Sequence, residues 1–99
     1  MTIQETKEGG VVTLAIEGRV DTTNAKELEV GVTNAFAKAK DVVLDLEKLN
    51  YISSAGLRAL LIGQKTATSK GGSMKVIHVG DMIMEIFETT GFSDILNIE

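Results

Sequence analysis

The 99-residue chain has no cysteine, no proline and no tryptophan, and only four of its residues are aromatic. The lack of cysteine excludes disulfides and thiolate metal sites, and it agrees with a reducing compartment. Because aromatic residues are scarce, Leu, Ile, Val, Met and Ala must fill the core. No apolar run approaches the ~18 residues of a membrane span, and residues 1–7 lack the apolar segment of a signal peptide. We therefore expect a cytoplasmic protein with no membrane partner.

Basic residues and histidine are also few. The net charge is −4, and the ten Lys and Arg residues are scattered, which argues against a nucleic-acid partner. The only histidine, His78, is interpreted as a strand-end residue, and Ser54 lies in no G-x-S-x-G elbow. One histidine with scattered carboxylates makes no metal site. We therefore expect no catalytic residue, no metal and no cofactor.

The order of periodic segments predicts one α/β domain over residues 1–99. Strands are expected at 2–6, 11–17, 42–46 and 74–79, and residues 95–98 either add a short edge strand or cover the core. Helices are expected after Asn24, after Ser54 and from Asp81. Right-handed crossovers between helices and strands then give a mixed sheet of four to five strands, with an N-terminal antiparallel hairpin and with helices packed against it.

The expected helix boundaries rest on capping residues. Asn24 with Glu27 three positions later forms a capping-box pattern, and Asp81 is expected to cap the last helix. Gly71 and Gly91 are expected to end helices, because glycine readily adopts the left-handed conformation at a helix C-terminus.

The most informative segment is 44–57, where an apolar strand leads through a short loop to Ser53 and Ser54 at the start of a helix. Backbone N–H groups and the helix dipole stabilise an anion at such a position. An exposed serine there is suited to phosphorylation, and it does not need to be a catalyst. The alternative for Ser54 is a role as helix N-cap only, and Ser53 is interpreted as a cap or loop hydroxyl.

The run Ser53-Ser54-Ala55-Gly56-Leu57 resembles the phosphorylatable loop of bacterial anti-sigma factor antagonists, the stand-alone members of the STAS domain family. The usual pattern of that loop is Asp-Ser-Ser/Thr-Gly-Leu. Residues 14–21 are similar to the family's strand-and-turn segment that ends in an acidic residue, and residues 86–92 to its C-terminal helix end. The resemblance covers nearly the whole chain and implies a STAS-like fold.

The resemblance also implies site residues. Ser54 matches the serine that the partner kinase phosphorylates, and Ser53, at the usual Asp position, is a less favoured acceptor. Asp21 is expected near the phosphoacceptor loop, with an ordinary turn role as its alternative. The residues expected to contact a partner or to form the loop are Asp21, Thr22, Thr23, Tyr51, Ser53, Ala55, Gly56 and Arg58.

The function implied by the resemblance is that of a phosphoprotein in signal transduction and transcription regulation. The unmodified domain sequesters an anti-sigma factor, a histidine-kinase-like ATPase with serine kinase activity, and so frees a sigma factor. In this partner-switching cycle, phosphorylation at Ser54 breaks the complex until a serine phosphatase resets it. The free domain is expected to be a monomer. Two alternatives remain: a STAS-type partner-switching regulator with a non-sigma output, and a small-molecule or nucleotide sensor.

Overall fold

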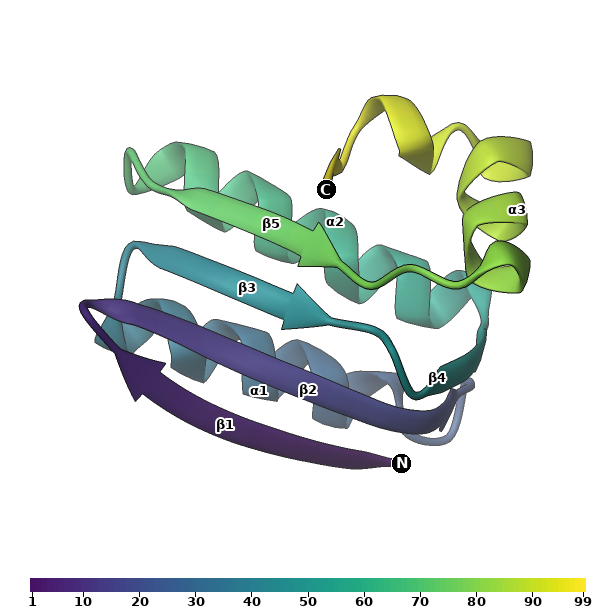
Figure 1. Ribbon diagram of the computed structural model, residues 1–99, viewed down its shortest axis with the longest axis horizontal. Helices are drawn as coiled ribbons and strands as arrows, with labels where there is room; N and C mark the ends of the chain where they lie inside the picture. The colour runs from purple at the N-terminus through teal and green to yellow at the C-terminus, as the bar shows by residue number, and fades with distance from the viewer.

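The computed structural model describes residues 1–99 as a six-stranded sheet with two long helices on one face and a shorter helix at one end (Figure 1). The elements are β1 (Thr2–Glu8), β2 (Val11–Val20), α1 (Ala25–Lys38), β3 (Asp41–Asp45), β4 (Leu49–Ile52), α2 (Ser54–Ser69), β5 (Ser73–Ile77), α3 (Asp81–Thr90), the 3-10 helix η1 (Phe92–Asp94) and β6 (Asn97–Ile98). None of the helices has both the length and the apolar character that a bilayer crossing requires.

The sheet is mixed, as expected from the sequence. Its strands lie in the order β1-β2-β3-β5-β6, β1 and β2 form the antiparallel hairpin, and the remaining pairs are parallel. Past an irregularity between Gly18 and Arg19, the end of β2 pairs with β4. The sheet has one strand more than the four to five expected, because residues 49–52, expected as a loop, form β4. Asn50 and Tyr51 are exposed, so β4 lacks the apolar run that marks a buried strand.

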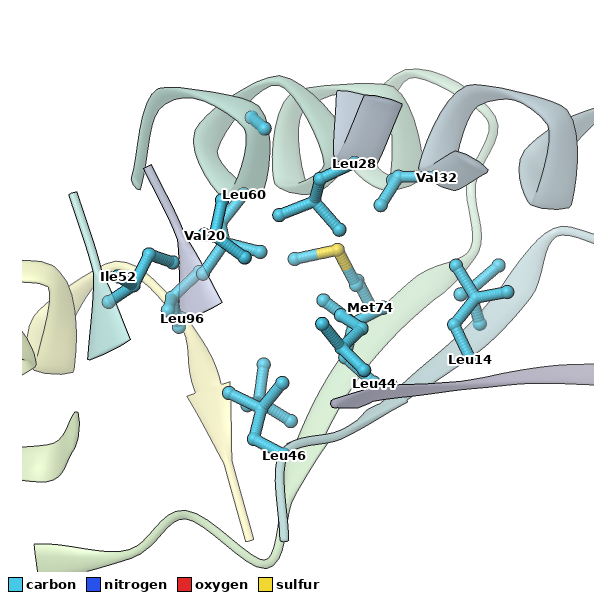
Figure 2. Packing of buried hydrophobic residues seen from close by; sticks show 14 of the residues in the cluster. Leu14, Val20, Leu28, Val32, Leu44, Leu46, Ile52, Leu60, Met74 and Leu96 are labelled. Atoms are coloured by element: carbon cyan, nitrogen blue, oxygen red, sulfur yellow. The ribbon is translucent and has the colours of Figure 1, made fainter. Parts of the chain in front are cut away.

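One hydrophobic cluster of 23 buried residues joins the sheet to α1, α2 and α3, and no polar or charged residue is buried. The strand contribution comes from alternate positions, such as Leu14 of β2 and Leu44 of β3. Figure 2 shows Leu28 and Val32 of α1 directed toward Met74 of β5. This packing holds α1 and α2 firmly against one face of the sheet.

The opposite face of the sheet carries no helix (Figure 1). Its residues alternate with the core residues and are half-buried or exposed; they include Thr13, Ala15, Val43, Asp45 and Lys75. We call this surface the open face. It is available to solvent along the three central strands.

The predicted N-cap position of Asn24 is confirmed without the expected side-chain bond, and the predicted Asp81 cap was wrong. Asn24 precedes α1, but its side chain does not cap the helix; it accepts from the Asp21 N–H at 2.9 Å and donates to the Arg19 carbonyl at 3.1 Å, so it closes the turn instead. Gly80, not Asp81, is the N-cap of α3, and Asp81 is the first helical residue. The expected helix ends are confirmed, because Gly71 and Gly91 have φ of 69° and 82°.

Candidate functional site

The two serines lie where β4 passes directly into α2. Ser53 has extended backbone angles and is the N-cap: its hydroxyl oxygen accepts from the Gly56 N–H at 3.2 Å. Its own N–H donates to the Val20 carbonyl at 2.8 Å, which ties the start of α2 to the end of β2. Ser54 is the first residue of α2 and is exposed. The structure therefore confirms a cap role for Ser53 and leaves the Ser54 hydroxyl without that role.

The surroundings of Ser54 favour an anion. No acidic residue occupies the first turn of α2, so the N-terminal partial positive charge of the helix is unopposed within α2. Arg58 lies four residues further along the helix, is exposed and forms no ion pair. Residues four apart on a helix are neighbours on its surface. A negative group on Ser54 would thus have a free guanidinium within reach.

Gly56 sets how closely the start of α2 approaches the sheet. A Cβ atom at this position would lie 2.6 Å from Ile52 Cγ1 and 2.8 Å from Val20 Cγ1, closer than real contacts allow. The absence of a side chain lets the first turn of α2 pack directly on β2 and β4. Ala55 beside it is half-buried. These contacts fix the position from which Ser54 is presented.

The turn after β2 lies beside the serine loop, because Asp21 follows Val20, whose carbonyl accepts from the Ser53 N–H. The Asp21 carboxylate accepts from the Thr23 hydroxyl at 2.6 Å and from the Thr23 N–H at 2.9 Å. These bonds, together with the charge of Arg19 at 3.6 Å, hold the pKa of Asp21 below its ordinary value. Thr22 and Thr23 are exposed. The turn role of Asp21 is confirmed, and its carboxylate is a fixed negative charge near the loop.

Tyr51 of β4 is paired with a residue that sequence reasoning missed. Arg19 is its register partner in β2, and the guanidinium carbon lies 4.7 Å from the centre of the Tyr51 ring. This distance is typical of a cation–π contact. The pairing could not be predicted, because β4 itself was not predicted. It extends the exposed surface around the serine loop onto β2.

The fold defines a small α/β domain with an exposed serine at a helix start, and comparisons with known proteins identify its family. The STAS domain family model matches residues 2–99. The chain belongs to the STAS domain family. This confirms the resemblance seen in the sequence and supports a regulatory binding domain rather than an enzyme.

Among curated relatives, the chain is 33% identical to BtrV of Bordetella bronchiseptica over 99% of this chain and 85% of that protein. The name of that relative assigns it provisionally to the anti-sigma factor antagonists. The anti-sigma-B factor antagonist of Bacillus subtilis is 26% identical over 84% of this chain and 76% of that protein.

Solved structures agree on the fold. An anti-sigma factor antagonist from Mycobacterium paratuberculosis superposes with a TM-score of 0.87 at 21% identity, over 98% of this chain and 83% of that one. The Bacillus cell fate determinant SpoIIAA, solved in a phosphorylated form, gives a TM-score of 0.76 at 13% identity, over 99% and 91% of the two chains.

Proposed function

We propose that the unmodified domain binds an anti-sigma factor that is also a serine kinase, and that phosphorylation of Ser54 dissociates this complex and so withdraws the sigma factor from transcription. The observation that carries the proposal is the exposed Ser54 hydroxyl on the first residue of α2, next to a Ser53 hydroxyl that is engaged in capping. The names of the relatives support the class of partner, and the phosphorylated form of SpoIIAA supports the modification. A serine phosphatase then returns the domain to its binding state.

The isolated fold should tolerate phosphate at Ser54. Phosphoserine adds about −1.5 to −2 charges, and a helix N-terminus stabilises a negative group by roughly 0.3–1 kcal/mol. Ser54 does not belong to the hydrophobic cluster, so no core contact is lost. The modification therefore changes the surface and leaves the packing intact.

Arg58 gives the phosphate an intramolecular partner. A phosphate on Ser54 and the guanidinium one turn further on can form a charge-assisted pair, which is among the stronger polar interactions. The pair would hold Arg58 along α2 and withdraw it from any contact with another protein. Phosphorylation thus adds negative charge and removes an available positive group in one step.

Dissociation of the partner requires only a modest change in free energy. A thousandfold loss of affinity corresponds to about 4 kcal/mol. A hydrated dianion that must be desolvated in a packed interface, with the Asp21 carboxylate nearby, can supply a penalty of this size.

The first test is phosphate transfer. The chain is incubated with ATP, Mg²⁺ and a histidine-kinase-like ATPase from the same genome, and the phosphate is located by mass spectrometry. We expect phosphate on Ser54, its loss in Ser54→Ala and its retention in the matched Ser53→Ala variant. Phosphate on Ser53, or no transfer, would contradict the proposal.

The second test separates binding from folding. We expect Ser54→Asp to weaken binding of the same ATPase by tenfold or more in isothermal titration calorimetry, while Tm stays within a few degrees. A sigma-release assay then separates a sigma output from another partner-switching output. Nucleotide binding by the chain alone would favour a sensor instead.

A further inference from the structure

We propose that Asp45, Glu47 and His78 form a binding site for a divalent transition-metal ion, with Zn²⁺ as its best match, on the open face of the sheet. Asp45 and Glu47 are neighbours in the sequence and His78 is distant from both, which is why the sequence alone predicts no metal site. The structure brings one donor atom of each to within 4.8 Å of the other two.

Backbone contacts place the three donors. Asp45 ends β3 and is the register partner of Ile77, which ends β5, so His78 follows directly beside it. His78 has φ of 56°, a left-handed conformation that is uncommon outside glycine. The Asp45 carboxylate accepts from the Glu47 N–H at 3.1 Å, which holds the short loop that carries Glu47.

The distances between donor atoms suit a small ion. Two ligands bonded to Zn²⁺ at tetrahedral angles lie roughly 3.3–3.4 Å apart. His78 Nδ1 lies 3.0 Å from Asp45 Oδ1 and 3.6 Å from Glu47 Oε1, so the observed spacings bracket that value. The third spacing, between the two carboxylates, is at most 4.8 Å, and rotation of the exposed Glu47 side chain would adjust it on binding. Zn²⁺ binding needs a neutral imidazole with its proton on Nε2, and it releases any proton on Nδ1 to solvent.

The charges at the cluster also favour a cation. No lysine or arginine forms an ion pair with Asp45 or Glu47, so a single imidazole faces two carboxylates. The side chains of His78 and Glu47 are 54% and 67% exposed, which leaves a path for an ion from solvent. One imidazole and two carboxylates are a donor set that Zn²⁺ accepts, whereas Ca²⁺ and Mg²⁺ prefer oxygen ligands only.

An adjacent hollow provides room for a further ligand. It measures about 160 Å³ and is lined by Asp45 and Glu47 together with Gln4, Ala15, Ile16, Glu17 and Lys48. A Zn²⁺ site with three protein ligands keeps a fourth position for water or a small anion. The hollow, which two of the three donors line, would hold that fourth ligand on the open face.

The test is titration of the full chain, without a polyhistidine tag, with ZnCl₂ after removal of metals by EDTA and dialysis. We expect one saturable site per chain in isothermal titration calorimetry. His78→Ala and Glu47→Gln should each weaken Zn²⁺ binding at this site by roughly tenfold or more. Glu8→Gln, which removes an exposed carboxylate from the far end of β1, is the matched control and should leave it unchanged.

A second measurement locates the ion. Nuclear magnetic resonance spectra should show Zn²⁺-dependent shifts concentrated at residues 45–47 and 78, and circular dichroism should show that each variant is folded. Unchanged Zn²⁺ affinity in His78→Ala would overturn the proposal, as would the absence of saturable binding at millimolar Zn²⁺. Equal affinity for Ca²⁺ that is indifferent to His78→Ala would also overturn it, because that result indicates nonspecific attraction to carboxylates.

Discussion

Replacement of Gly56 by alanine tests whether close packing at the start of α2 holds the serine loop in place. The new methyl group would lie 2.6 Å from Ile52 Cγ1 and 2.8 Å from Val20 Cγ1. Both neighbours are buried β-branched side chains with little freedom to move. The substitution therefore forces α2 away from the sheet or forces Ile52 and Val20 out of their preferred rotamers.

Two opposing effects set the size of the change. Overpacking a core costs about 1–3 kcal/mol, whereas Gly→Ala within a helix gains roughly 0.5–1 kcal/mol. We expect a net loss of about 1–2 kcal/mol in the free energy of unfolding for Gly56→Ala. Gly31→Ala in α1 is the matched control: its methyl group meets only Ile3 Cδ1, at 3.3 Å, the end of a flexible side chain. It should leave stability unchanged or raise it.

Urea unfolding followed by circular dichroism measures both variants. With a slope of about 1–3 kcal/mol per molar urea, the midpoint for Gly56→Ala should fall by roughly 0.3–2 M with an unchanged slope. The Gly56 N–H, which bonds to Ser53, should also exchange with solvent faster. If Gly56→Ala were as stable as Gly31→Ala, the argument that Gly56 sets the approach of α2 to the sheet would be refuted.

Two further substitutions test the hydrogen bonds around Ser54. Ser53→Ala removes the acceptor for the Gly56 N–H and should cost about 1 kcal/mol in urea unfolding; an unchanged midpoint would show that the cap contributes nothing. Thr23→Val removes the hydroxyl donor to Asp21, so the Asp21 pKa should rise toward its ordinary value of 3.8 in a carboxyl ¹³C titration. Since the folded pKa of Asp21 is depressed, its stabilising effect is present above pH 3.8 and is lost as pH falls through the folded pKa. Thr23→Val should therefore lose less stability than the unchanged protein as pH falls through that range. An Asp21 titration that does not shift would contradict the role of the Thr23 hydroxyl in lowering this pKa.

The sequence was sufficient where local patterns decide the structure. Alternating apolar residues located β2, an apolar run located β3, and the transition from that strand to paired serines located the start of α2. Ser54 was predicted in its observed position because a strand, a loop and a helix start are all encoded within residues 44–57. The exposure of its hydroxyl follows from that order of elements.

The sequence was insufficient where contacts join distant segments. The cation–π pair of Arg19 and Tyr51 depends on the pairing of β2 with β4 past an irregular register. Asn24 occupies the N-cap position, but its side chain bonds to the Asp21 N–H and the Arg19 carbonyl of the preceding turn instead of to the helix. The approach of His78 to Asp45 depends on the register of β3 with β5, which no local pattern specifies.

Ser54 and Gly56 lie two residues apart, but they should control different properties of the domain. Ser54 projects from the first position of α2 to solvent, so a change there alters charge at the surface without changing the core. Gly56 contacts buried side chains of both β2 and β4, so a methyl group there alters packing without changing charge. Partner affinity should therefore respond to Ser54→Asp with little change in unfolding, and unfolding should respond to Gly56→Ala. A large loss of stability in Ser54→Asp would instead place that hydroxyl within the structural framework and remove the basis for a phosphorylation switch.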